Sequence, residues 1–123
     1  MLRAINAVRA ANHVPRLHIG ARLERAARSH SSDMLRLNYF AHGAFTARMK
    51  YFGVQGPLIG ENLAWGSGPY ASPTAIVQAW LTSPEHRANL LRPGFRRVGV
   101  AAPSGPFAGQ RRAIVVTADF AGS

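Results

Sequence analysis

The spacing of apolar side chains predicts helices over the first two thirds of the chain. Between residues 21 and 38 the apolar positions recur every three or four residues, as on one face of an amphipathic helix, and the charged residues lie off that stripe. The same reasoning predicts helices over residues 2–12 and 44–52, after Ser72-Pro73, and after Ser83-Pro84. Serine followed by proline is typical of a helix start, because the hydroxyl caps a backbone N–H and proline suits the first turn.

The period of the pattern changes in the last third of the chain. The segments "RRVGVAA" and "AIVVTADF" are apolar and rich in β-branched residues, and "PSGPFAGQ" between them is typical of turns. We predict an antiparallel hairpin whose loop is too long for a tight two-residue turn. Helices followed by a sheet indicate an α+β fold without repeated βαβ units. The length and the 47% apolar content predict one packed domain, residues 1–123.

The charge of the chain is strongly positive. Its formal net charge is +10, from 15 basic and 5 acidic residues, and every basic residue except Lys50 is arginine. One interpretation is attraction to an anionic partner such as nucleic acid, acidic lipid or an acidic wall polymer. The other is codon bias toward arginine, with the charges scattered over a solvated surface. No basic run exceeds two residues and no aromatic ladder accompanies them, so we expect no specific nucleic-acid partner. We also expect a monomer.

Cysteine usage and targeting signals say little about compartment. The chain has no cysteine, and no apolar run approaches the roughly 18 residues of a membrane span. Arg3 and Arg9 interrupt the apolar character that a signal peptide would need at the N-terminus. The protein either stays where it is made or begins where a leader was removed.

Glu61 is the acidic residue that most needs an explanation. It lies in the apolar stretch "IGENLAWG", and an unpaired buried carboxylate is unfavourable. Glu61 should therefore have a partner or carry a proton, and Asn62 is a local hydrogen-bonding candidate.

Two histidines are candidates for a site shared with Glu61. His42 follows two aromatic residues in "YFAHG", and His86 lies in the first turn of the helix after Pro84, where a protonated imidazole is disfavoured. Neutral imidazoles bind metals or act as bases, and two histidines with one carboxylate suit zinc or another divalent cation, or general acid–base chemistry. The alternative is three separate helix-end and turn residues with no shared site.

Two further polar residues have simpler interpretations. His30 lies on the apolar face of the helix over residues 21–38, where a lone histidine is more often a hydrogen-bonded core residue than a ligand. Ser83 precedes proline, so we interpret it as a helix cap whose oxygen is already engaged by backbone donors, and not as a nucleophile.

Several stretches, taken in order, resemble one known family. The segments "INAVRAANHVPRL", "YFAHG", "IGENLAWG", "IVQAWLTSPEHRANLL" and "FRRVGVAA" resemble bacterial domains of the CAP superfamily. That superfamily is also termed SCP-like, and it includes pathogenesis-related-1 proteins and cysteine-rich secretory proteins. The resemblance implies an α-β-α sandwich, in which a small antiparallel sheet is flanked by helices on both faces. It also implies a central cleft lined by two histidines and acidic residues, where some members hold a divalent metal.

The resemblance carries over to particular residues. It places His42, Glu61 and His86 in the cleft with Asn62 beside them, makes His42 and His86 the metal ligands, and makes Arg87 and Asn89 structural pins of one helix. The eukaryotic pattern takes a second acid from just after the tryptophan that matches Trp80, and a second histidine from a Gly-His-Tyr segment. This chain has neither, so the full four-residue cleft is absent.

The function that the resemblance implies is ligand binding outside the cytoplasm. We expect a secreted or cell-envelope module that takes a small molecule, a lipid or a wall component in the cleft, with or without zinc or another divalent cation. The alternative is a metal-assisted hydrolase in which a bound cation activates water. A third interpretation is a structural domain whose polar triad holds helices to the sheet.

Overall fold

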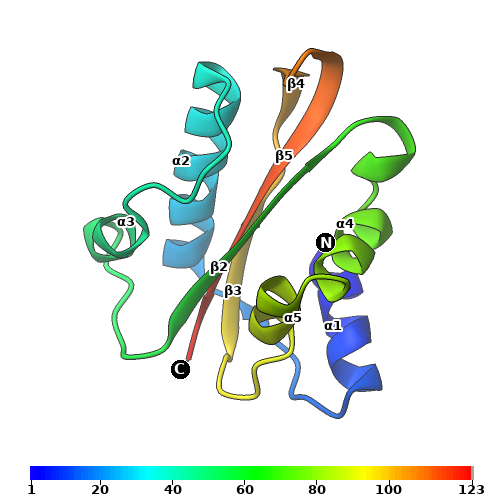
Figure 1. The fold of residues 1–123 in the computed structure, drawn as a ribbon. Helices are drawn as coiled ribbons and strands as arrows, with labels where there is room; N and C mark the ends of the chain where they lie inside the picture. The colour runs from blue at the N-terminus through cyan, green and yellow to red at the C-terminus, as the bar shows by residue number, and fades with distance from the viewer. Residues whose placement is uncertain (123) are drawn as a thin grey trace.

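A computed structural model describes residues 1–122 as helices packed on both sides of a sheet (Figure 1). The helices are α1 (Leu2–Ala11), α2 (Ala21–Leu37), α3 (Phe45–Tyr51), α4 (Pro73–Leu81) and α5 (Pro84–Leu90), with a 3₁₀ turn η1 (Gly68–Ala71). The strands are β1 (His18–Ile19), β2 (Ile59–Gly66), β3 (Arg97–Ala101), β4 (Ser104–Phe107) and β5 (Gln110–Ala121). The helices predicted over residues 2–12, 21–38 and 44–52 are confirmed to within one residue at each end, and the two predicted after Ser72 and Ser83 begin where expected.

Within the described residues the strands form one sheet of order β1-β3-β5-β2, with β4 also paired to β5. Every pairing is antiparallel except that of β1 with β3. Helices α2 and α3 cover one face of the sheet, and α1, α4 and α5 cover the other (Figure 1). The structure therefore confirms the α+β class and the α-β-α sandwich.

The predicted hairpin is correct in its pairing and wrong in its connection. β3 and β5 pair antiparallel, as expected. However, the intervening segment forms β4, which makes its own hairpin with β5 through the two residues Ala108 and Gly109. Both have positive φ, 51° and 79°, which is the backbone conformation of a tight hairpin turn. The abundance of glycine and proline in this segment concealed a short strand.

The face covered by α1, α4 and α5 is a continuous apolar core. Alternate residues of β5, namely Val116, Ala118 and Phe120, point into it. Phe120 is fully buried and stacks on Phe95 with ring centroids 5.2 Å apart. This face contributes the larger of the apolar clusters that stabilise the domain.

The face covered by α2 and α3 has a different organisation. One apolar cluster surrounds Met34 and Leu63, and a second surrounds Leu23 and Met49. Between them lies a band of buried polar residues: His30, Ser31, Glu61, Thr117 and Asp119. Burying polar groups is unfavourable unless they have hydrogen-bond partners, so apolar packing alone does not explain this face.

The outer edge of β2 accepts hydrogen bonds from side chains of α4 and α5. The indole N–H of Trp80 donates to the Leu63 carbonyl at 3.0 Å, and the Asn89 amide donates to the Glu61 carbonyl at 3.2 Å. These bonds satisfy backbone acceptors that an edge strand would otherwise present to solvent or to another chain. They also fix β2, and with it Glu61, against α4 and α5.

Candidate functional site

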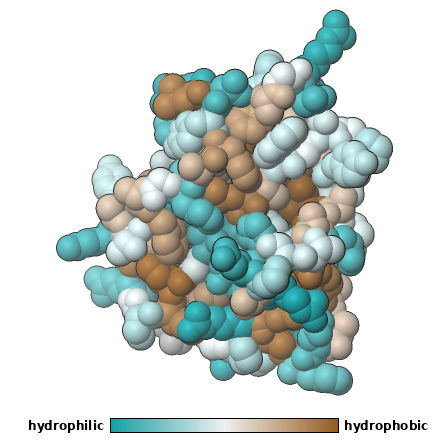
Figure 2. All heavy atoms as spheres, in the orientation of Figure 1, coloured by the Kyte–Doolittle hydropathy of each residue, from teal (hydrophilic) through white to brown (hydrophobic). Residues whose placement is uncertain are grey.

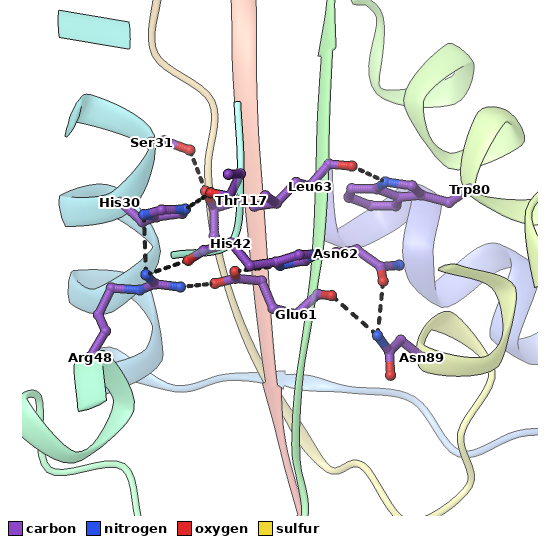
Figure 3. A network of polar contacts seen from close by, with 11 residues as sticks. His30, Ser31, His42, Arg48, Glu61, Asn62, Leu63, Trp80, Asn89 and Thr117 are labelled. Carbon is purple, nitrogen blue, oxygen red and sulfur yellow. Dashed lines mark hydrogen bonds and ion pairs between the residues drawn. The ribbon is translucent and has the colours of Figure 1, made fainter. Parts of the chain in front are cut away.

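The centre of the polar band is the carboxylate of Glu61. Glu61 lies on β2 with its side chain on the α2 and α3 face, and only 1% of that side chain is exposed. One of its oxygens accepts a hydrogen bond from His42 Nδ1 at 2.8 Å, and the other accepts from the guanidinium of Arg48 (Figure 3). Burial alone would raise the pKa of Glu61, but the hydrogen bonds from its neighbours hold that pKa below its ordinary value, so Glu61 is ionised at neutral pH.

Arg48, from α3, joins three parts of the site. Besides Glu61, it donates to the backbone carbonyl of His42 and to Nδ1 of His30, each at 3.1 Å. Because a guanidinium can only donate, His30 Nδ1 must accept, and its Nε2 carries the hydrogen that it donates to the Ala41 carbonyl at 2.7 Å. Burial and then the charge of Arg48 lower the pKa of His30, so this imidazole is neutral.

These bonds fix the segment that carries His42 from both ends. His30 holds Ala41, Arg48 holds the His42 backbone, and Glu61 holds the His42 ring. The interpretation of His30 as a hydrogen-bonded core residue is thus confirmed. The His42 ring itself is more than half exposed, at 54%. When the ring is neutral and its Nδ1 donates to Glu61, the free lone pair is on Nε2.

Asn62 does not lie where it was expected. As the next residue along β2, it points to the opposite face of the sheet, where it is fully buried. Its amide donates to the His86 carbonyl at 3.0 Å, and its oxygen accepts from Asn89 at 3.1 Å. The prediction that Asn62 would bond Glu61 is wrong, because neighbouring residues of a strand cannot share a face.

His86 occupies the first turn of α5 and is half-buried. Burial, and secondly the charge of His42, lower its pKa, so the two imidazoles lie near enough to influence each other. Its position is set through the bond between its carbonyl and Asn62. The structure therefore brings His42 and Glu61 into direct contact, while His86 approaches them from the other helical layer.

The α5 helix meets β2 closely at Gly60. A Cβ atom there would lie 2.8 Å from the Phe95 ring and 2.9 Å from Asn89 Oδ1. The glycine of the Gly-Glu-Asn-Leu motif is therefore required by this close approach. Asn89 is confirmed as a pin of α5, whereas Arg87 is exposed.

The interpretation of Ser83 as a side-chain cap is wrong. Ser72 accepts from the Ala75 N–H at 3.1 Å, as predicted, but Ser83 makes no such bond to the start of α5. The proline at the first position of α5 and the acidic Glu85 in its first turn remain as the local signals of a helix start.

The donor atoms limit how a metal would be held. Among residues 1–122, no group of three or more His, Cys, Asp or Glu is arranged to hold an ion. Both oxygens of Glu61 are engaged by His42 and Arg48, which removes it from the ligand set inferred from sequence. Of the metal ligands predicted from sequence, this leaves His42 and His86, with the carboxylate of Glu61 bonded to the Nδ1 side of the His42 ring.

Two contributors to the site were not predicted from sequence. Arg48 is one of 14 arginines and lies in no motif, so only the need of Glu61 for a partner pointed to such a residue. Asp119 lies in the segment "AIVVTADF", which was predicted to form part of the hairpin, but no role was inferred for it. It is fully buried on the same face as Glu61 and directly opposite it in register.

A groove of about 420 Å³ adjoins the site between α2 and α3. His30 and Arg48 line it together with the aromatic rings of Tyr39, Tyr51 and Phe52. Figure 2 shows hydrophilic side chains gathered near the centre of this view, with hydrophobic patches on several sides of them. The buried Glu61 is connected to the surface through Arg48 and the exposed ring of His42.

Comparison with known proteins identifies the family. Residues 2–120 match the model of the CAP, cysteine-rich secretory protein, family. The Bacillus subtilis (strain 168) protein YkwD is 38% identical over 100 residues, which is 77% of this chain and 38% of YkwD. The chain thus spans well under half of that relative's length.

Solved structures show the same fold. An extracellular protein containing an SCP domain from Bacillus anthracis superposes with a TM-score of 0.78 at 29% identity, covering 97% of this chain and 38% of that one. An outer surface protein from Borrelia burgdorferi gives a TM-score of 0.79 at 21% identity, covering 99% of this chain and 90% of that one. These relatives are bacterial proteins described as extracellular or outer-surface. Among the described residues of the present chain, no helix is both long enough and apolar enough to cross a membrane.

Proposed function

Because the chain belongs to the CAP family, we propose that it is a ligand-binding module whose binding groups are the rings of His42 and His86. In this proposal Glu61 is not a ligand group but the residue that orients His42. A secreted or cell-envelope location is proposed with it, on the basis of the extracellular and outer-surface relatives.

One contrast in exposure carries the proposal. The Glu61 side chain is 1% exposed and the His42 side chain is 54% exposed, yet they share a 2.8 Å hydrogen bond. Three residues with little exposure hydrogen-bond the segment that carries the exposed His42 ring: Glu61, Arg48 and His30. Stability alone does not require an ordered surface imidazole, whereas recognition of a ligand gains from one that is already positioned.

The chemistry of the site favours a ligand with a polar or anionic group attached to apolar area. Two of the five acids are buried, and Glu24 and Asp33 are paired with Arg28 and Arg36, so the exposed charge is overwhelmingly positive. Such a surface raises the local concentration of anionic ligands. The aromatic groove beside Arg48 supplies apolar contact, so a small molecule, a lipid or a wall component with an acidic head fits this description.

Zinc or another divalent cation belongs to the proposal as a second ligand. The lowered pKa of His86 keeps this imidazole neutral, and the carboxylate behind His42 is the arrangement that commonly supports a metal-bound histidine. Such a cation, when bound, would supply a positive centre for an anionic ligand. A metal-assisted hydrolase is not favoured by any specific contact, because Glu61 is held by two donors and is not free to act as a base.

Calorimetric titration with zinc chloride tests the site. The parent should bind saturably, and the double variant His42→Ala, His86→Ala should not. The control is His18→Ala, which removes an exposed histidine on β1, outside the site. Zinc binding that survives in the double variant would place the metal elsewhere, and a parent without saturable binding would remove zinc from the proposal.

Vesicle binding tests the organic ligand separately. Vesicles of phosphatidylglycerol and of phosphatidylcholine are compared for the parent and the double variant at low and high salt. Binding through the site should weaken in the double variant at both salt concentrations. Binding that is equal in both proteins and vanishes with salt would show general charge attraction and would contradict the proposed role of the two histidines.

A further inference from the structure

Asp119 is a fully buried acid in the middle of the sheet. It lies on β5, where its backbone is paired with Glu61 of β2 on one side and with Gly99 of β3 on the other. Its side chain points to the α2 face, the same face as that of Glu61. Two carboxyl groups therefore lie side by side beneath a helix.

No basic donor reaches Asp119. Neither of its oxygens meets an N–H or O–H donor within residues 1–122. On the β3 side Gly99 offers no side chain, and a Cβ atom there would fall 2.1 Å from the backbone of α2, so the helix packs directly on the sheet. The charged or titratable groups that face this region are Glu61 from β2, Arg48 from α3 and His30 from α2.

These surroundings decide where a proton must lie. An ionised carboxylate that is buried without a donor, next to a second carboxylate, is strongly disfavoured. Glu61 already accepts from His42 and Arg48 and is therefore the member of the pair that is ionised. Asp119 must then be the member that is protonated. Burial, and next the hydrogen bond and charge of Glu61, raise its pKa to about 10, in agreement with this argument.

We propose that Asp119 is a neutral carboxylic acid that donates a hydrogen bond to Glu61 and thereby positions the carboxylate that orients His42. Asp119 is a positioning residue in this scheme, since it lies beneath the sheet-facing side of α2 and touches no ligand. A neutral acid carries no buried charge that donors would have to compensate, which agrees with the lack of donors at its oxygens. It also gives Glu61 a third donor besides His42 and Arg48. The proposal deepens the binding role proposed above, and its test uses no ligand, so either can fail alone.

The composition of the chain makes the protonation state directly measurable. Asp33 and Asp119 are the two aspartates of the sequence. Protein labelled with ¹³C at the aspartate side-chain carboxyl should give two NMR signals. Between about pH 5 and 8 the Asp119 signal should keep the chemical shift of a protonated acid. The Asp33 signal should be that of a carboxylate, because its hydrogen bond from Tyr39 lowers its pKa. Two carboxylate signals would overturn the proposal.

Two variants test whether Asp119 acts through Glu61 on His42. Asp119→Asn keeps a neutral donor, and Asp119→Leu removes it. The measured quantity is the pair of ¹⁵N shifts of the His42 ring, assigned by comparison with His42→Ala. Asp119→Asn should leave the hydrogen on Nδ1 as in the parent, whereas Asp119→Leu should give a mixture of the two tautomers.

A control separates positioning from a general structural effect. Thr117→Val removes another buried polar group from the same strand face, one that bonds Ser31 and not Glu61. It should leave the His42 ring signals unchanged. Equal His42 spectra for Asp119→Leu and the parent would contradict the positioning role. If Asp119→Leu does not fold, the labelled-aspartate measurement on the parent still decides the protonation state.

Discussion

Glu61 and Asn62 are neighbours in the chain, but they serve opposite sides of the sheet. Asn62 is fully buried against α5, and both its amide and its carbonyl groups are bonded to neutral partners. Glu61 is equally buried, yet its partners are a cation and an imidazole that reaches the surface. Burial alone therefore does not distinguish a structural from a functional polar residue, whereas the identity of its hydrogen-bond partners does.

Arg9 and Arg48, which lie on opposite faces of the sheet, show the same contrast. Arg9, on the α1 side, is fully buried and donates only to backbone carbonyls: those of Pro15, Leu90, Arg92 and Phe95. Its bonds tie the end of α1 to the segment that leads from α5 into β3. Arg48 donates instead to a carboxylate and to the segment of His42. We infer that the α1, α4 and α5 face mainly carries stability, whereas the α2 and α3 face carries Glu61 and His42. Helix α5 adds His86 to the site from the other layer.

The largest effect should come from the apolar core of the first face. Phe120→Ala should lower the free energy of unfolding by about 3–5 kcal/mol, because it leaves a cavity beside Phe95 in the central strand. Urea denaturation measures this. Tyr51→Ala, at a side chain on α3 that is largely exposed, should stay within about 0.5 kcal/mol of the parent. A loss below about 1 kcal/mol for Phe120→Ala would contradict the assignment of the two faces.

Removing the hydrogen bonds of Asn89 on that face should lower the free energy of unfolding by a smaller amount. Asn89→Leu removes the donor to the Glu61 carbonyl and to Asn62 Oδ1, and leaving buried acceptors unpaired costs about 1–3 kcal/mol. Thermal and urea unfolding of Asn89→Leu and of Arg87→Ala provide the comparison. Arg87 lies exposed on the same helix and should be nearly neutral. Equal losses for the two variants would show that α5 is held by more than the Asn89 amide.

The pH dependence of stability should differ between the parent and Asp119→Asn. The folded state keeps the Asp119 proton up to a pKa of about 10, whereas the unfolded chain releases it near the ordinary value of 3.8. Between these values the folded state binds more protons, so the contribution of Asp119 to stability is lost as pH rises, by at most about 1.4 kcal/mol per pH unit.

Asparagine does not titrate, so the difference in unfolding free energy between the variant and the parent should change steadily from about pH 5 to 8 in favour of Asp119→Asn. Urea midpoints of both proteins at each pH measure it. The lowered pKa values of His30 and His86 act with the opposite sign, but both proteins contain these residues. A difference that is constant with pH would mean that Asp119 is ionised in the folded state.

The sequence predicted the helices well because their signals are local. Apolar periodicity located α2, and the Ser72-Pro73 pair located α4 with its side-chain cap. For His42 and Glu61, the residues alone left a shared site as one of two interpretations, and the resemblance of separate motifs to one family placed both in a cleft. β4 was missed because glycine and proline within it are typical of turns, and only its pairing with β5 makes it a strand.

The errors at the site have one physical origin. Glu61 and Asn62 were interpreted as local partners because the segment was not assigned as a strand, and the alternation of a strand would have separated them. Arg48 and Asp119 reach Glu61 from α3 and β5, through packing that no single stretch of sequence describes. The cost of burying the Glu61 carboxylate predicted that it has a partner, but it did not identify that partner.

The smallest effect on stability should come from the most exposed member of the site. His42→Ala should change the unfolding free energy by no more than about 0.5 kcal/mol, because the ring is half exposed and Glu61 keeps its bond from Arg48. The same substitution should weaken zinc or ligand binding, measured by calorimetry on the folded variant. Asn62→Leu should show the reverse, with a clear loss of stability from unpaired buried groups. If His42→Ala instead destabilised the fold as much as Asn62→Leu, the imidazole would belong to the framework, and the two faces of β2 would not divide stability from binding.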